Sequence, residues 1–250
     1  MNEKDYKAFY DRAGKLNGWD FSKVRCQVEG EAADLYREVR QACRPSDFLL
    51  DIGTGGGEAL LQLRDAAQLL VGIDASAGMI RTAAVNRDRL QADNVRFIQM
   101  DAGQIDFPEQ FFQIISCRHA PFHAQQAAKV LAANGIFLTQ QVTEGDKQNL
   151  KQAFGRGQGY CQLAGTLQER MIRELTAAGF KEIAVHHVET AEYYRAAEDL
   201  IFLLKHAPII PGFGEDPADY AVLHRFIEEN QSEHGIRTNA SRLIVTARKS

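Results

Sequence analysis

The sequence predicts an α/β fold in which helices cover both faces of a mostly parallel sheet. Short apolar runs recur between residues 48 and 142, and segments with helical periodicity separate them. The first of these runs ends in a cluster of glycines, as a strand does when it turns tightly into a helix. Hydrophobic residues make up 45% and charged residues 25% of the 250-residue chain. These values suit a globular protein that buries a full core.

The first 44 residues are predicted to be helical. Aromatic residues recur at helical spacing over residues 2–16. A second helix is expected over residues 29–43, because the residue before Pro45 disfavours the helical conformation. No strand is expected before residue 48. Residues 1–44 are therefore interpreted as an N-terminal helical cap segment.

Strands and helices then alternate through the central part of the chain. The expected strands cover residues 48–52, 69–73, 95–100, 111–116, 136–142, 180–188 and 242–248. The expected helices cover residues 58–67, 76–91, 123–131 and 167–178, and a short helix is expected near 147–154. We assign residues 45–190 to a cofactor-binding core and residues 239–250 to its final strand.

Residues 191–238 separate the last two expected strands. They contain two helical patterns, over residues 192–206 and 217–233. A connection of this length inside a compact sheet is more often functional than accidental. We expect it to complete the helical cap.

Composition and charge restrict the function. The net charge of −4 weighs against a nucleic-acid substrate, although it leaves room for a local basic patch. The charged N-terminus does not resemble a signal peptide, and no apolar run approaches the ~20 residues of a membrane helix. The four cysteines are widely spaced, which indicates free thiols and no metal site. A cytoplasmic protein without a membrane partner is expected.

The glycine turn indicates which ligand the first strand meets. A nicotinamide-binding turn reads G-x-G-x-x-G, but Glu58 occupies the third glycine position here. The turn instead resembles motif I of the class I S-adenosylmethionine-dependent methyltransferases, D/E-x-G-x-G-x-G. Its residues are Asp51, Gly53, Gly55 and Gly57. The resemblance covers residues 45 to about 190 and the last strand.

This resemblance implies a doubly wound, seven-stranded sheet in the order 3-2-1-4-5-7-6, with the last strand antiparallel. It also implies S-adenosyl-L-methionine as cofactor and S-adenosyl-L-homocysteine as product. Asp74, at the end of the second strand, would accept the ribose hydroxyls, and Asp101, after the third strand, would contact the adenine amino group. The cofactor-binding residues are expected to be Asp51, Gly53, Thr54, Gly55, Gly57, Asp74, Ala75, Met79, Met100, Asp101, Ala102 and Cys117.

The segment after the fourth strand borders the transferable methyl group in this family. It contains His119 and His123, which are the candidate general bases because imidazole titrates near neutral pH. A structural role for both histidines stays open, with His119 ordering the loop and His123 beginning a helix. Cys117 is expected to be a buried thiol, because the Pro-Cys nucleophile of the cytosine-C5 enzymes is absent. The D/N-P-P-Y/F motif of adenine-N6 enzymes is also absent.

We expect a small-molecule acceptor, held between the core and the cap. The candidate substrate residues are Tyr10, Trp19, Arg118 and Arg156. An RNA or protein methyltransferase of the same fold is one alternative. A non-catalytic module that binds S-adenosylmethionine or S-adenosylhomocysteine is another, and a nicotinamide oxidoreductase is the most distant. The sequence does not identify the acceptor atom or the oligomeric state.

Overall fold

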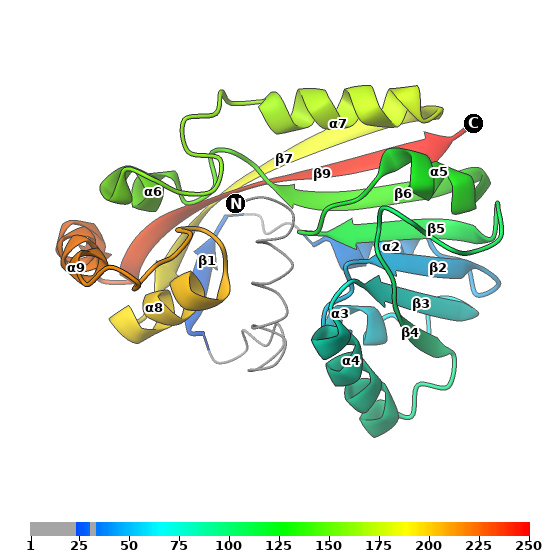
Figure 1. Ribbon diagram of the computed structural model, residues 1–250, viewed down its shortest axis with the longest axis horizontal. Coiled ribbons are helices and arrows are strands. Elements are labelled where there is room, and N and C mark those ends of the chain that lie inside the picture. The colour runs from blue at the N-terminus through cyan, green and yellow to red at the C-terminus, as the bar shows by residue number, and fades with distance from the viewer. Residues whose placement is uncertain (1–23, 31–33) are drawn as a thin grey trace.

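The computed structural model describes residues 24–30 and 34–250, and these residues build one sheet with helices on both faces (Figure 1). The helix expected over residues 2–16, together with Tyr10 and Trp19, lies outside the described residues. The parallel strands are β2 (Phe48–Ile52), β3 (Leu69–Asp74), β4 (Val95–Gln99), β5 (Phe112–Arg118) and β6 (Leu131–Val142). The other strands are β1 (Cys26–Glu29), β7 (Phe180–Tyr194), β8 (Gln231–Ser232) and β9 (Gly235–Lys249).

The strand order confirms the predicted fold class. The order along the sheet is β1-β7-β9-β6-β5-β2-β3-β4, with β8 beside β9. The pairs from β4 to β6 are parallel, whereas β9 runs antiparallel between β6 and β7. Counted from β2, and with β1 and β8 left out, this is the expected order 3-2-1-4-5-7-6.

The edge strand β1 is a correction to the sequence analysis. It pairs antiparallel with β7, with Cys26 opposite Tyr194, although no strand was expected before residue 48. Its four residues are mostly exposed and show no apolar alternation, so only the edge offered by β7 identifies them as a strand. The helix expected over residues 29–43 is shorter and begins later, as α2 (Leu35–Ala42).

The helix after the glycine turn is also shorter than expected. Only α3 (Glu58–Leu61) is α-helical, whereas a helix was expected over residues 58–67. Beyond it, backbone bonds such as Leu63 N–H to the Leu60 carbonyl span three residues rather than four. This tighter winding buries Leu60, Leu61 and Leu63 together. Packing of leucines, rather than helical propensity, determines the path of the chain here.

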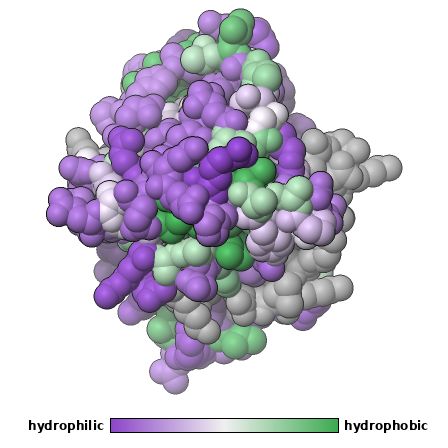
Figure 2. Space-filling model, turned by 90° about the vertical axis from the view of Figure 1, so that its left-hand side faces the viewer, coloured by the Kyte–Doolittle hydropathy of each residue, from purple (hydrophilic) through white to green (hydrophobic). Residues whose placement is uncertain are grey.

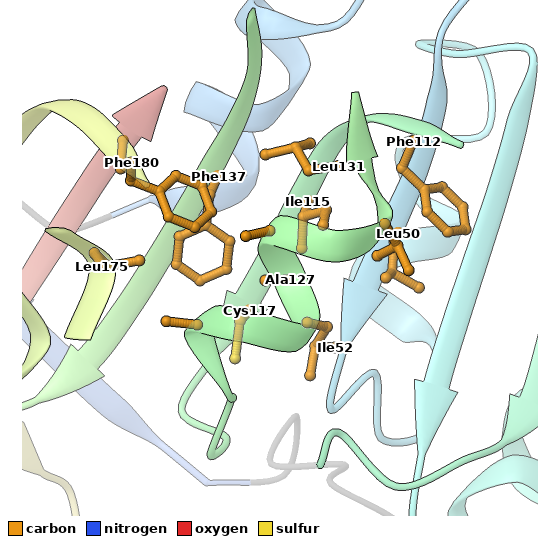
Figure 3. Close-up of a cluster of buried hydrophobic side chains, with 14 of the residues drawn as sticks. Leu50, Ile52, Phe112, Ile115, Cys117, Ala127, Leu131, Phe137, Leu175 and Phe180 are labelled. Carbon is orange, nitrogen blue, oxygen red and sulfur yellow. The ribbon is translucent and has the colours of Figure 1, made fainter. Parts of the chain in front are cut away.

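One face of the sheet packs against α5 (Ala124–Val130) and α7 (Thr166–Ala177). Alternate residues of each strand point to this face, so that Leu50 and Ile52 join Ile115 and Phe137 in one buried cluster (Figure 3). All four side chains are at most 1% exposed. This rigid layer fixes the strand ends that carry the candidate site.

The opposite face packs against α2, α3 and α4 (Ala77–Leu90). Leu35 and Val39 of α2 join Leu49 and Ile114 of the sheet in a second buried cluster. Asp51 lies two residues after Leu49 and therefore points to the same side as α2. That placement brings the Asp51 carboxylate under α2.

A third apolar cluster holds the remaining helices together. It joins α6 (Gln148–Phe154), α8 (Ala197–His206) and α9 (Ala218–Asn230) to the far ends of β7 and β9, at the left of Figure 1. The surface at this end is mostly hydrophilic, with a few hydrophobic residues exposed near its centre (Figure 2). Among the described residues, no helix has the length and apolar character needed to cross a membrane.

Candidate cofactor and acceptor site

The glycine turn after β2 has the geometry that a closely approaching ligand requires. Gly53, Gly55 and Gly57 have φ angles of 72°, 57° and 77°, in the left-handed region that favours glycine. A β-carbon on Gly53 would lie 2.2 Å from Cβ of Ala120, and one on Gly57 would lie 2.4 Å from Cζ of Phe97. Both positions therefore exclude side chains for steric as well as conformational reasons.

Asp74, at the end of β3, ties the glycine turn to the next helix. Its Oδ2 accepts a hydrogen bond from the backbone N–H of Gly55 at 3.0 Å, and its Oδ1 accepts one from Ser76 N–H at 2.8 Å. The Ser76 hydroxyl in turn accepts from Met79 N–H at 3.3 Å and caps α4, close to the expected start of this helix. The carboxylate is therefore held rigidly at the point where the turn and α4 begin.

The next strand end places Asp101 at the surface. Asp101 follows β4, is exposed, and accepts a hydrogen bond at Oδ1 from Gly103 N–H at 2.7 Å. Met100 is partly buried and packs against the first apolar cluster, whereas Met79 is a fully buried residue of α4 itself. Because β2, β3 and β4 are parallel neighbours, their carboxyl ends meet at one edge of the sheet.

The other expected cofactor residues lie close to this edge. The Ala75 carbonyl accepts a hydrogen bond from Gln99 Nε2 at 3.1 Å, which ties the ends of β3 and β4 together. Thr54 is buried, with its hydroxyl against Gly72, and therefore faces the protein interior. Ala102 is partly buried in the turn after β4.

Asp51 is buried beneath the glycine turn, where only 1% of the residue is exposed. Burial raises the pKa of Asp51 to about 6, and hydrogen bonds to its carboxylate oppose part of that rise. The Ser116 hydroxyl donates one of these bonds at 2.6 Å, and the Tyr36 hydroxyl donates at 3.3 Å. The guanidinium of Arg118 lies 4.8 Å from the centre of the Tyr36 ring. Arg118 thus sits over the helix that covers the motif I carboxylate.

Tyr36 and Ser116 were missed in the sequence analysis. Tyr36 belongs to a helix whose contact with β2 is decided only by packing, so its neighbour could not be inferred from spacing. Ser116 stands opposite Asp51 in the parallel pairing of β2 and β5. A polar residue in the middle of an apolar strand was the only available signal for it.

Cys117 is fully buried among the apolar side chains under α5 (Figure 3). Its Sγ lies 3.2 Å from the Ala120 carbonyl oxygen. Burial, followed by the nearby Asp51 carboxylate, raises the pKa of Cys117 to about 12. The side chain is therefore a neutral thiol, as the sequence analysis expected, and not a nucleophile.

His119 begins the loop after β5 with a φ of 54°. Its backbone N–H donates to the Gln140 carbonyl at 2.8 Å, and its ring Nε2 lies 3.2 Å from Nε2 of the Gln140 amide. Loss of water around the ring, followed by the guanidinium groups of Arg242 and Arg118, lowers the pKa of His119 well below its usual value. The imidazole is therefore neutral at pH 7, although the residue as a whole remains exposed.

His123 lies at the other end of the loop that follows β5. It is the exposed residue that precedes α5, and its Nε2 lies 3.2 Å from the place that a β-carbon on Gly103 would occupy. Oδ1 of Asp101 lies at the same distance from that place. His123 thus faces the loop after β4, whereas His119 faces β6.

Arg156 is engaged within the helical end of the molecule. Its guanidinium donates to both carboxylate oxygens of Asp219 on α9, at 2.7 and 2.9 Å, and to the Pro211 carbonyl. Asp219 is 6% exposed. These contacts use the planar donor edge of the guanidinium to hold α9 against the loop after α6.

A buried charged network adjoins His119, and no spacing of residues in the chain predicted it. Nζ of Lys147 lies 2.7 Å from Oε2 of Glu192, and only 2% of the Lys147 side chain is exposed. Arg242 forms an ion pair with Asp146, and its second terminal nitrogen lies 3.9 Å from Oε1 of Glu192. Burial opposes the charge on Glu192, but Lys147 lowers the pKa of this carboxyl below its usual value. The network joins β7, β9 and the turn before α6.

Comparison with known proteins identifies the central domain. Residues 49–136 match a family model described as a methyltransferase domain. Over 120 residues, the chain is 34% identical to the uncharacterized methyltransferase YcgJ of Bacillus subtilis (strain 168). That match covers 45% of this chain and 47% of the relative, so the aligned region spans about half the length of the relative. Residues 49–136 are therefore similar to a methyltransferase domain, in agreement with the resemblance of the glycine turn to class I S-adenosylmethionine-dependent methyltransferases.

Solved structures share the fold of this methyltransferase domain. The crystal structure of YcgJ superimposes with a TM-score of 0.63 at 18% identity, over 86% of this chain and 97% of that one. The [4+2]-cyclase SpnF superimposes with the same TM-score at 19% identity, over 100% and 97%. A geranyl diphosphate methyltransferase gives 0.53 at 11% identity, over 86% and 76%. A cyclase among these structures shows that the fold alone does not determine the reaction.

Proposed function

We propose that the protein transfers the methyl group of S-adenosylmethionine to a small molecule. The observation that carries this proposal is the meeting of three ligand-binding features at one sheet edge. These are the glycine turn after β2, Asp74 at the end of β3 and Asp101 after β4. The methyltransferase family match over residues 49–136 includes all three.

The proposed contacts follow the polarity of the cofactor. The carboxylate of Asp74 would accept the two ribose hydroxyls, because each carboxylate oxygen can accept more than one hydrogen bond. Asp101 would accept from the adenine amino group, and the methionine amino and carboxylate groups would lie over the glycine turn near Asp51. The apolar walls around the adenine would come from Ala75, Met79, Met100 and Ala102.

The proposed reaction is an in-line displacement. The bond between the methyl carbon and the sulfonium sulfur breaks, and sulfur keeps the electron pair and becomes neutral. A new bond forms between the methyl group and the acceptor, which gives up its proton. The protein mainly aligns the two reactants and excludes water. General-base roles for His119 and His123 stay predictions.

A small-molecule acceptor is favoured over a nucleic acid by three observations. The net charge of −4 provides no general attraction for phosphate groups. Arg156, one of the arginines that a polymer would need, is bound to Asp219. A methyltransferase of the same fold is named for geranyl diphosphate, a small molecule. The cysteines are all free thiols, which agrees with a reducing cytoplasm.

Two measurements test the proposal together. S-adenosylhomocysteine at ~100 times its dissociation constant should stabilise the protein by about 2.7 kcal/mol, and Asp74→Ala should abolish this stabilisation. Asp93→Ala, at an exposed turn before β4, is the matched control and should keep it. Incubation with methyl-labelled S-adenosylmethionine and a cell extract should then label small molecules. Stabilisation without transfer would indicate a binding module, and labelled RNA would indicate a polymer substrate.

A further inference from the structure

The side chain of Gln140, near the proposed acceptor site, has a hydrogen-bonding group that the fold itself does not use. Gln140 lies on β6, directly opposite Arg118 at the end of β5, and only 6% of the residue is exposed. Its amide nitrogen meets Nε2 of His119 at 3.2 Å. Its Oε1, in contrast, is buried and accepts no hydrogen bond from any residue in the described part of the chain.

A buried carbonyl oxygen without a donor is rare in folded proteins, because desolvation is not offset by a new bond. The neighbouring Gln141, in contrast, is held through its amide nitrogen. The Gln141 amide donates to the Ala120 carbonyl at 3.0 Å and to the Thr139 hydroxyl at 2.9 Å. Gln140 projects to the other face of β6, toward His119 and the loop that borders the methyl donor. A ligand group that donates a hydrogen bond would satisfy the buried Oε1 of Gln140.

The charged groups around this position come from four elements. Arg118 lies at the end of β5, Arg242 on β9, Lys147 before α6 and Glu192 on β7. Asp146 also faces this region through its ion pair with Arg242. Among the groups that act on the His119 ring, the three cations oppose protonation and only Glu192 favours it. The local potential is therefore positive.

A positive potential acts on a bound acceptor as it acts on the imidazole. It disfavours a protonated amine and favours loss of a proton from a hydroxyl. The Gln140 amide nitrogen lies 3.2 Å from His119 Nε2, and as a donor it engages the lone pair of that ring nitrogen. An acceptor that ionises easily does not need that lone pair.

We propose that Gln140 and the surrounding cations select an acceptor with an acidic hydroxyl group, such as a phenol or an enol, so that the methyl group is transferred to oxygen. This inference rests on the proposed methyl transfer. The hydroxyl donates to Gln140 Oε1 as the acceptor binds, which orients its oxygen. The nearby cations then favour release of its proton, which passes to bulk solvent beside the exposed residues Arg118 and His119. The resulting oxyanion attacks the methyl carbon as the carbon–sulfur bond breaks, and sulfur keeps the electron pair.

The first test identifies the atom that receives the methyl group. S-adenosylmethionine with a ¹³C-labelled methyl group is incubated with the full chain and the low-molecular-mass metabolites of a bacterial extract. The ¹³C chemical shift of the product distinguishes O-methyl from N-, S- and C-methyl groups. An O-methyl product is expected. An N-, S- or C-methyl product overturns the inference while leaving methyl transfer intact, and no labelled product overturns both.

The second test concerns the role of Gln140. Gln140→Leu should lower kcat/KM for the O-methylated acceptor about tenfold, because the hydroxyl loses its hydrogen-bond acceptor. Its affinity for S-adenosylhomocysteine, measured by calorimetry, should not change. Gln125→Leu, on the exposed side of α5, is the matched control and should keep full activity. An unchanged kcat/KM in Gln140→Leu would refute the role of Gln140.

The third test uses the pH profile, which a purely structural role would not shift. Activity should rise with pH as the bound hydroxyl ionises. Arg118→Gln removes a nearby positive charge, so the rise should move to higher pH, whereas Arg118→Lys should restore the wild-type profile. Gln140→Glu should move the rise in the same direction, because a carboxylate opposes ionisation of the hydroxyl. An unshifted profile in both charge variants would refute the electrostatic part of the inference.

Discussion

Replacement of Asp51 by asparagine tests how the buried motif I carboxylate affects stability. The pKa of Asp51 rises from 3.8 to about 6 on folding, because its carboxylate is buried beneath the glycine turn. A carboxyl group with a raised pKa binds its proton more tightly in the folded state. Its favourable contribution is therefore complete below pH 3.8 and is lost as the pH rises through about 6.

The size of this effect follows from the shift. About two pKa units, at about 1.36 kcal/mol each, correspond to roughly 3 kcal/mol of stability lost above the folded pKa. Asparagine keeps a carbonyl oxygen that can accept the hydrogen bond from Ser116, but it does not ionise. The variant should therefore gain stability relative to the wild type as the pH rises.

Urea denaturation at a series of pH values measures the difference. Between pH 4 and pH 8, the stability of Asp51→Asn should increase over that of the wild type by roughly 2 to 3 kcal/mol. Most of this change should occur below about pH 6. Asp88→Asn, at a largely exposed aspartate of α4, is the control and should show no such trend. If the wild type and Asp51→Asn follow parallel curves, Asp51 is not the group that burial perturbs.

Three further perturbations test the turn, the buried network and the two histidines. Gly53→Ala forces a β-carbon into a position with positive φ and a 2.2 Å contact, and should lower the urea-unfolding free energy by roughly 2 to 5 kcal/mol. Gly56→Ala meets only the flexible Glu58 side chain and should be tolerated; equal losses would contradict the argument. Lys147→Met leaves Glu192 buried without its partner and should cost about 3 to 5 kcal/mol, and adding Glu192→Gln should recover part of it. An additive double variant would show that the pair is not coupled. His123→Ala should raise KM for S-adenosylmethionine more than it lowers kcat, because His123 faces the loop of the predicted adenine contact; a selective loss of kcat would instead support a base.

The local features of the parallel core could be predicted from the sequence. Short apolar runs identified β2 to β6, and Ser76 marked the start of α4, because these signals depend on neighbours in the chain. The glycine turn was recognisable for the same reason, since positive φ and close packing require glycine at fixed positions. Parallel pairing then brought Asp74 and Asp101 to the same sheet edge.

What the tertiary structure decided lies between segments that are distant in the chain. The contact of Tyr36 with Asp51 depends on how α2 crosses the sheet, and β1 is a strand only because β7 offers it an edge. Arg156 was a candidate for binding substrate, but α9 supplies the carboxylate that holds it.

This difference between local signals and contacts of distant segments also separates the proposed cofactor site from the proposed acceptor site. The residues proposed to bind the cofactor follow single strand ends, so local sequence is enough to predict them. The surroundings of His119 instead combine side chains from β5, β6, β7, β9 and the turn before α6, and they meet only because the antiparallel strands continue past the parallel core. Sequence alone predicted the residues that are proposed to bind the methyl donor, and tertiary packing decided which charged and hydrogen-bonding groups surround His119.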